Sequence, residues 1–306
     1  MSSSDQKLQQ AILEAIVYFD IFSYPLTPFE IWQNLQTRAS YAQVCDALEK
    51  NEWLRKRITS KDGLWYLRKN TGDPIEARQS RYRVSALKFK KALRFARLLR
   101  VIPWIEAVYA CNSLGFFHAK PESDIDLFII TRPGYIWASR FFSVLLAELT
   151  GFRPKDSHAK DGLCLSFFVT TRARMETPLF EKSDPYYFHW MTKLEPLFVR
   201  GQAHERFWGG NTWVQKAFPQ MEMIRPPVTV HARQKRGTEY GDAGWFVRRM
   251  EQGLRALQLR LMPAYLKDAQ GKGTGVIIND EFLKFHDHDR REQFRTQYEK
   301  KLAAVV

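Results

Sequence analysis

The chain has 306 residues, of which 45% are hydrophobic and 14% aromatic. This composition can form a buried core, so it excludes an intrinsically disordered protein, and the length allows two or three domains. The formal net charge of +14 at pH 7 favours anionic partners such as nucleotides, nucleic acid or acidic lipid.

The first 72 residues have the pattern of a winged-helix-like domain. Apolar residues recur at helical spacing in LQQAILEAIVYFDIF, and further helices are predicted to begin after Thr27 and Ser40, both good N-caps. The alternating segment LRKRITSKDGLWYLRKN, with Asp62-Gly63 at its centre, predicts a β-hairpin. Such a domain can bind DNA or dock onto protein. Because the third helix is largely acidic and the basic residues gather in the hairpin, both roles stay open.

A strongly basic helix is predicted next. Residues 77–100 contain nine basic residues and no acid, while apolar residues keep a helical stripe. Such a run is either a solvated face of a connecting helix or a wall that attracts phosphate, including nucleic acid.

The remaining chain predicts a mixed α+β fold. Its expected strands are 104–111, 124–131 and 162–171, and its expected helices are 134–151, 185–198, 204–218, 242–266 and a last one from about 287. We therefore expect three regions: a winged-helix-like domain (1–72), an α/β domain with a small mixed sheet (73–200) and a helical C-terminal region (201–306).

The cysteines and the apolar segments predict the cellular compartment of the protein. The three cysteines lie far apart inside apolar runs, which predicts free thiols in a reducing compartment: Cys45, Cys111 and Cys164. The first ten residues lack a secretion-signal pattern, and segment 135–152 is too short and too charged to span a bilayer. We expect a soluble, cytoplasmic protein.

Two aspartates in the segment YACNSLGFFHAKPESDIDLFIIT carry the chemistry. Residues i and i+2 of a strand share a face, so Asp124 and Asp126 are expected side by side, with Ile125 and Leu127 in the core. Adjacent carboxylates repel each other unless a cation compensates them. Upstream, a turn at Ser113 would offer a hydroxyl and backbone N–H groups to phosphate oxygens.

This arrangement resembles the nucleotidyltransferase superfamily typified by DNA polymerase β. The matching residues are the strand AVYAC, the pair Asn112-Ser113, a short spacer and then DIDLFII, within residues 100–175. The order of YFDIFSYPLT, the basic helix, SDIDLFIIT, CLSFFVT and LKFHDHD is also similar to a bacterial group of uncharacterised nucleotidyltransferase-domain proteins with an N-terminal winged-helix-like region.

The resemblance implies a function and its residues. It implies transfer of a nucleoside monophosphate (NMP) from a nucleoside triphosphate (NTP) to a hydroxyl or phosphate acceptor, with Asp124 and Asp126 as catalytic ligands of two Mg²⁺ ions. It implies a nucleotide-binding role for Asn112, Ser113 and Ser123. It does not identify the acceptor.

The chain departs from the family pattern at two positions. Asn112 replaces the usual first glycine, and asparagine is the other residue that best tolerates a positive φ. The third carboxylate is expected on strand 162–171, where Ser166 is the third-position candidate and the nearest acids are Asp161 and Glu176. A hydroxyl is a poor general base. The alternative is therefore a non-catalytic nucleotide-sensing or nucleic-acid-binding protein that retains the fold.

The motif HDHD (286–289) invites comparison with metal phosphohydrolases. Those enzymes draw their ligands from separate helices, so we expect Asp287 or Asp289 to cap the last helix instead.

Overall fold

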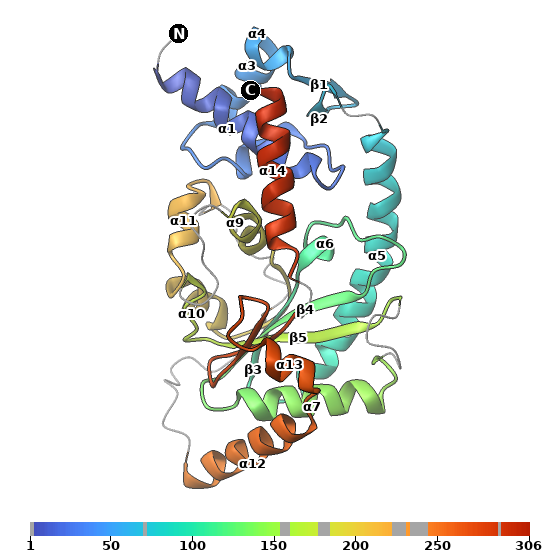
Figure 1. Ribbon diagram of the computed structural model, residues 1–306, viewed down its shortest axis with the longest axis vertical. Coiled ribbons are helices and arrows are strands. Elements are labelled where there is room, and N and C mark those ends of the chain that lie inside the picture. Colours follow the sequence, from blue (N-terminus) through green and yellow to red (C-terminus); the bar gives the residue numbers. More distant parts are fainter. Residues whose placement is uncertain are drawn as a thin grey trace.

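The computed structural model describes residues 3–69, 72–153, 160–176, 184–221, 231–232, 244–286 and 289–306. It has a mixed α and β architecture, with a helical unit at one end and a sheet layered between helices at the other (Figure 1). No described helix combines the length and the apolarity needed to cross a lipid bilayer.

The N-terminal unit contains helices followed by a hairpin, as predicted. Its elements are α1 (Ser3–Asp20), α2 (Pro28–Gln33), α3 (Tyr41–Lys50), α4 (Glu52–Arg55), β1 (Ile58–Lys61) and β2 (Leu64–Leu67). Thr27 and Ser40 each form a capping box, which confirms both predicted helix starts. The hairpin turn places Asp62 and Gly63 at φ 55° and 75°.

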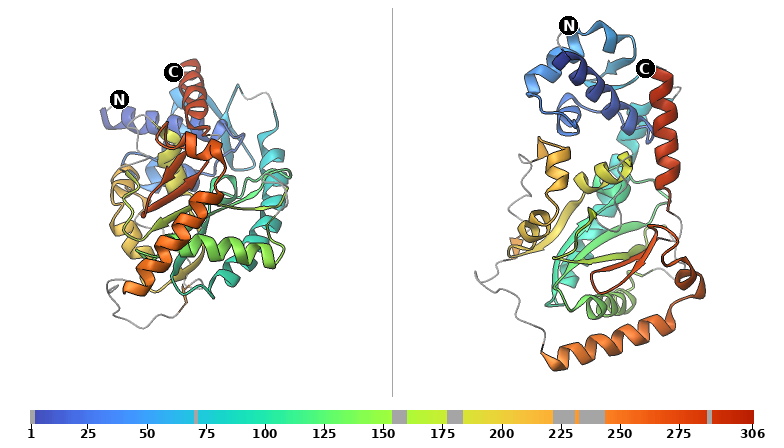
Figure 2. Two further views of the ribbon diagram at one scale, coloured as in Figure 1. Left: turned by 60° about the horizontal axis from the view of Figure 1, so that its bottom comes forward. Right: turned by 60° about the vertical axis from the view of Figure 1, so that its left-hand side comes forward.

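The C-terminal helix α14 (Arg291–Val305) packs against this N-terminal unit. Lys301 forms an ion pair with the buried Asp20 at 2.5 Å, and Arg57 Nε donates to the Val305 carbonyl at 2.5 Å. Two views show α14 running from the sheet region to the N-terminal helices (Figures 1 and 2). The two ends of the chain therefore build one packed unit, although the sequence placed them in separate regions.

A seven-stranded mixed sheet forms the centre, in the order β7-β6-β3-β4-β5-β9-β8. Its strands are β3 (Ile105–Ala110), β4 (Ile125–Thr131), β5 (Leu163–Thr170), β6 (Glu195–Arg200), β7 (His231–Ala232), β8 (Val276–Ile278) and β9 (Phe282–Phe285). The pairs β3–β4 and β5–β9 are antiparallel, whereas β4–β5 is parallel. The three strands predicted in the central region are all present in it.

Three predicted helices differ from the observed elements. Segment 185–198 contains only α9 (Pro185–Thr192), followed by strand β6, because its apolar run Leu197–Val199 is buried on both faces and has no helical period. Segment 204–218 divides into α10 (Ala203–Gly209) and α11 (Trp213–Ala217), and 242–266 into α12 (Trp245–Leu261) and α13 (Ala264–Ala269). The C-terminal region expected to be helical also supplies β7, β8 and β9 to the sheet.

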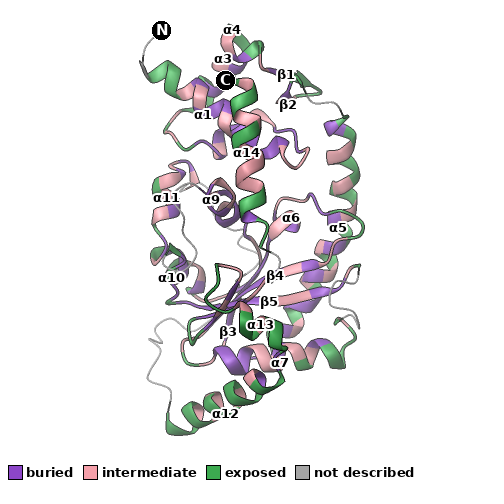
Figure 3. Cartoon of the chain, in the orientation of Figure 1, coloured by how far each residue is buried: buried purple, intermediate pink, exposed green. Residues whose placement is uncertain are grey.

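Helices cover both faces of the sheet. On one face lie α5 (Pro74–Leu99) and α7 (Ile136–Leu149), and on the other lie α9, α10 and α11. Strand β4 serves both layers, since Leu127 and Ile129 pack on the first face and Phe128 and Ile130 on the second. The strands are accordingly mostly buried, whereas α12 lies outside α7 and is largely exposed (Figure 3).

A carboxylate joins α12 to α7. Glu251 accepts hydrogen bonds from the backbone N–H groups of Trp137 (3.1 Å) and Ala138 (2.7 Å) in the first turn of α7. Its partial burial, with a smaller contribution from the charge of Asp280, raises the pKa of Glu251 from 4.5 to about 7. The folded protein therefore holds this proton more tightly than the unfolded chain does.

We expect this proton to make stability depend on pH. A raised carboxyl pKa stabilises the fold below about pH 4.5, and the contribution is lost as the pH rises to about 7. Because Glu251→Gln remains neutral, its free energy of unfolding relative to the wild type should rise over this interval and level off above it. Urea unfolding of both proteins at each pH measures the difference, and a difference that does not change with pH contradicts the assignment.

Candidate functional site

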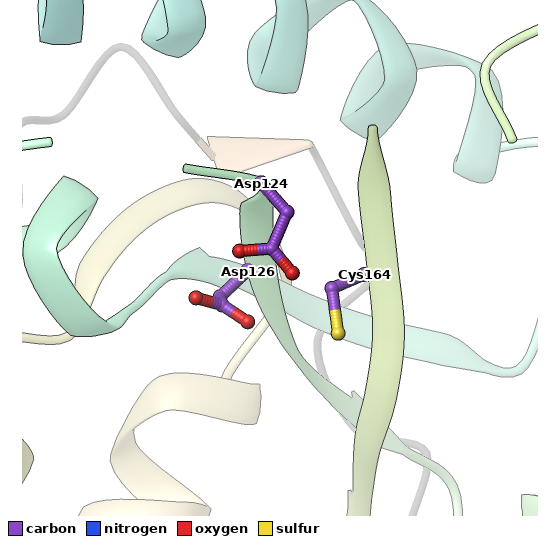
Figure 4. Close-up of side chains that lie close together, drawn as sticks. All are labelled: Asp124, Asp126 and Cys164. Atoms are coloured by element: carbon purple, nitrogen blue, oxygen red, sulfur yellow. The ribbon is translucent and has the colours of Figure 1, made fainter. Parts of the chain in front are cut away.

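The two aspartates lie at the beginning of β4 on one face of the sheet, as predicted. Asp124 directly precedes the strand and Asp126 is its second residue, while Ile125 and Leu127 are buried in the opposite layer. Both aspartates are partly exposed. Their carboxylates point into the same space (Figure 4).

Cys164 joins the aspartates from the neighbouring strand. The parallel register places Asp126 directly beside Cys164 of β5. One carboxylate oxygen of Asp124, one of Asp126 and the Cys164 sulfur all lie within 4.8 Å of one another. Figure 4 shows the thiol pointing from β5 toward the aspartates. The sequence interpretation missed Cys164 because a cysteine inside an apolar run was expected to be an inert buried thiol.

Ser166, the expected third-position residue, is not part of this group of ligand atoms and contacts the Cys164 sulfur. The β4–β5 register shifts between Asp126 and Phe128, so Leu165 and Ser166 together oppose Leu127. This β-bulge interrupts the two-residue alternation of side chains from which Ser166 was predicted to be the third-position residue. The Ser166 Oγ is 3.0 Å from the Cys164 Sγ and 3.2 Å from His286 Nε2.

The thiols beside the carboxylates are protonated at neutral pH. Burial, followed by the negative charge of Asp126, raises the pKa of Cys164 above its ordinary range. Burial likewise raises the pKa of Cys111, with smaller contributions from Asp126, Cys164 and Asp124. A cation at the site would reverse this effect, because a coordinating thiol loses its proton.

The turn after β3 adopts the predicted positive φ. Asn112 has a φ of 52°, and its side-chain oxygen accepts hydrogen bonds from Trp190 Nε1 (2.9 Å) and the Tyr186 hydroxyl (3.4 Å). The backbone N–H of Cys111 donates to the Asp126 carbonyl at 3.3 Å, so the turn is tied to β4 next to the carboxylates. Ser113 follows in the short helix α6 (Asn112–Gly115) and is partly exposed.

Gly115 allows this turn to pack closely against Lys193, the residue at the end of α9. A Cβ atom at Gly115 would lie 2.0 Å from the Lys193 carbonyl oxygen, which is shorter than any normal contact. We expect Gly115→Ala to lower the free energy of unfolding by about 1–3 kcal/mol, because the backbone must move. Gly209→Ala in α10 is the matched control: no atom lies within 4 Å of its added Cβ, and the change should be neutral or stabilising. Urea denaturation compares them, and equal effects contradict the prediction.

Lys88 of the basic helix organises the loop that leads to Asp124. Its buried ammonium group donates to the Ser123 carbonyl (2.6 Å) and the Pro121 carbonyl (3.2 Å), and pairs with the Asp161 carboxylate (2.6 Å). Ser123 uses its own hydroxyl to donate to the Lys120 carbonyl at 2.9 Å. Asp161 is therefore engaged with Lys88 instead of joining the two aspartates, and Glu176 is exposed elsewhere.

The basic helix, observed as α5, divides its charges between packing and solvent. Arg78 pairs with Glu30 at 2.8 Å, Arg81 donates to the Phe22 carbonyl at 2.8 Å, and Lys91 donates to the Asp161 carbonyl at 2.6 Å. The exposed basic residues are Arg83, Lys90, Arg94, Arg97 and Arg100. Much of the run therefore connects α5 to the rest of the molecule.

A cavity of about 530 Å³ has His286 in its wall, whereas Asp124, Asp126 and Cys164 do not line it. Its walls come from the N-cap of α9, the end of α13 with the loop before β8, the end of β9 and the start of α14. The lining residues are Asp184, Ala269, Lys272, Gly273, Thr274, Gly275, Val276, His286, Asp289, Arg291, Glu292 and Arg295. Asp289 also accepts a hydrogen bond from the Arg291 backbone N–H at 3.0 Å, but the N-cap of α14 is Arg290, whose side chain forms no capping hydrogen bond, so Asp289 is not the predicted cap. Asp287 and His288 lie outside the described residues. The volume is that of a small-molecule pocket.

Two histidines near the site have defined environments. His118 packs between Phe116 and Tyr24, and its Nε2 contacts the Phe22 carbonyl oxygen at 2.8 Å. Burial and the neighbouring Arg81 lower the pKa of His118 to about 4, so this histidine is neutral and structural. His286, in contrast, contacts both Ser166 and the cavity.

Comparison with known protein families, with curated proteins and with solved structures finds no match to this chain. The chemistry of the donor atoms therefore carries the functional interpretation. Two carboxylates on one strand fit a divalent cation such as Mg²⁺, and the adjacent Cys164 sulfur adds a donor that softer metals prefer.

Proposed function

We propose that the protein is a metal-dependent nucleotidyltransferase, which transfers an NMP group from an NTP to a hydroxyl or phosphate acceptor. The single observation that carries this proposal is the pair Asp124 and Asp126 at the start of β4, beside the Asn112–Ser113 turn. The hydrogen bond from Cys111 to the Asp126 carbonyl holds the turn and the carboxylates together.

The reaction makes distinct demands on these residues. An acceptor oxygen forms a bond to the α-phosphorus of the NTP, the bond from this phosphorus to the oxygen it shares with the β-phosphorus breaks, and pyrophosphate leaves. A hydroxyl acceptor also gives up its proton, which passes to solvent water. Divalent cations, when bound, neutralise the charge of the phosphates. Asp124 and Asp126 would hold them, and Ser113 would donate to a phosphate oxygen. Lys88, through its bonds to the Pro121 and Ser123 carbonyls, positions the loop before Asp124.

The cavity beside His286 supports an enzyme or a ligand-binding protein over a purely structural one. Its volume is sufficient for part of a nucleotide or for a small acceptor. His286 of the cavity wall is hydrogen-bonded to Ser166, and Ser166 to Cys164, so two hydrogen bonds connect the cavity wall to one proposed metal ligand.

A second candidate function is nucleotide sensing or nucleic-acid binding without catalysis. The observation that favours it is the thiol of Cys164, which occupies the place beside Asp126 where the resemblance implies a third carboxylate. A protonated thiol neither offsets the charge of a hard cation nor acts as a general base near neutral pH.

Pyrophosphate release separates the two functions. The full chain is incubated with each NTP, a divalent cation and pooled hydroxyl or phosphate acceptors. Release that requires both the cation and an acceptor supports the transferase. Thermal stabilisation by an NTP without pyrophosphate release supports the sensor. Neither stabilisation nor release with any NTP contradicts both.

We further propose that the N-terminal unit is a winged-helix-like module. Helices α1–α4 followed by the β1–β2 hairpin support this assignment. The surface of α3 is not basic, because Asp46 pairs with Lys50 at 2.7 Å and Glu49 is exposed. We therefore propose that the module docks onto protein; duplex DNA binding with a steep salt dependence would favour the DNA-reading role instead.

A further inference from the structure

We infer that Asp124, Asp126 and Cys164 form a mixed carboxylate–thiolate centre that selects a thiophilic divalent cation, such as Zn²⁺ or Co²⁺, over Mg²⁺. This inference rests on the metal site of the proposed function and changes which ion that site takes.

Strand pairing places Asp126 beside Cys164, and Lys88 holds the loop that carries Asp124 at the start of β4. Asp126 and Cys164 are direct neighbours in the parallel β4–β5 register, and Asp124 stands two residues before Asp126. Their ligand atoms lie within 4.8 Å of one another. Ligands on one zinc ion lie roughly 3–4 Å apart, given metal–ligand bonds of about 2.0–2.3 Å. Small side-chain rotations therefore close the site, and further positions remain for water or a phosphate oxygen.

The Cys164 sulfur shifts the preference of the donor set from Mg²⁺ to a softer cation. Mg²⁺ is a hard cation that takes oxygen ligands in a near-octahedral shell and gains little from sulfur. Thiolates favour softer metals, and affinity for a mixed site rises from Mn²⁺ through Co²⁺ to Zn²⁺. A carboxylate in place of Cys164 would remove this selection, so the identity of one side chain decides the preferred ion.

A second layer of side chains holds the sulfur in place. In the metal-free protein the Cys164 thiol donates to the Ser166 Oγ at 3.0 Å, and this oxygen lies 3.2 Å from His286 Nε2. When the thiol loses its proton to bind a cation, the direction reverses, and the Ser166 hydroxyl donates to the sulfur. The β-bulge at Leu165–Ser166 places the hydroxyl behind the sulfur. Partners of this kind fix the orientation of a metal ligand. In this arrangement the third metal ligand is the Cys164 sulfur, and Ser166 is a hydrogen-bond partner of that sulfur.

Metal binding to the full, metal-free chain tests the inference without any activity measurement. Calorimetric titration with Zn²⁺, Co²⁺ and Mg²⁺ ranks the affinities, and the Co²⁺ complex reports sulfur ligation by its thiolate-to-metal absorption band. We expect Zn²⁺ to bind at least about 100-fold more tightly than Mg²⁺. Cys164→Asp should weaken Zn²⁺ and abolish the band, and it should strengthen Mg²⁺ by about tenfold or more. Cys164→Ser provides a second variant if Cys164→Asp does not fold.

Cys45→Ser is the matched control, because Cys45 is also a partly exposed free cysteine but lies in α3 of the N-terminal unit. It should leave every affinity and the absorption band unchanged. Mg²⁺ bound as tightly as Zn²⁺, or a band that survives in Cys164→Ser, overturns the selectivity and leaves the transferase proposal standing. No binding of any of the three ions overturns the inferred metal centre, and cation-dependent pyrophosphate release then decides the proposed function separately.

Discussion

Asp126→Asn is expected to remove the metal-dependent stabilisation by NTP and to lower nucleotidyl transfer by roughly 10²–10³-fold or more. The physical reason is the loss of one anionic ligand from a site that must concentrate positive charge on the phosphates. Asparagine has nearly the same shape and leaves Ile125 and Leu127 in the core, so the fold should be retained. Thermal unfolding with and without NTP and cation, followed by pyrophosphate release, measures both effects.

Asp268→Asn is the matched control for this change. It makes the same chemical substitution on an exposed position of α13 and should behave as the wild type does. If Asp126→Asn retains the full metal-dependent shift, the carboxylate does not hold the cation and the proposed site is wrong. If both variants lose the cation-dependent thermal stabilisation by NTP, the loss arises from the change in surface charge and not from loss of a metal ligand.

Asp184→Ala is expected to lower the free energy of unfolding by about 3–5 kcal/mol, because it leaves the Arg291 guanidinium buried without its counter-charge. Arg291 Nε donates to the Asp184 carboxylate at 2.5 Å, and both side chains are almost wholly buried. Asp184 also caps α9 by accepting from the Tyr187 backbone N–H at 3.1 Å. The substitution thus disconnects the starts of two helices that flank the cavity.

Urea denaturation measures this loss against Glu148→Ala. The control breaks the Glu148–Arg153 pair (2.8 Å), which is exposed, and should cost no more than about 1 kcal/mol. A loss for Asp184→Ala as small as the control's would show that the buried pair contributes nothing beyond a surface ion pair.

Much of the local structure could be predicted from residue chemistry. The capping boxes at Thr27 and Ser40, the Asp62-Gly63 turn and the positive φ of Asn112 all depend on contacts within a few residues. The alternation of Asp126 with Ile125 and Leu127 likewise follows from the two-residue period of a strand. Local patterns failed at β6, where burial on both faces removes the periodicity that separates a strand from a helix.

The sequence by itself determined the mixed α and β composition, the main strands of the central region and the placement of Asp124 and Asp126 on one face. Only the tertiary structure decided which side chain completes that face. A parallel register and a bulge between two strands, remote in sequence, bring Cys164 to Asp126 and set Ser166 behind it. The tertiary structure also joins the last helix to the first, through the ion pair of Lys301 and Asp20. Strand register and helix docking depend on the packing of the whole chain, because no local spacing specifies which distant backbone will be the neighbour.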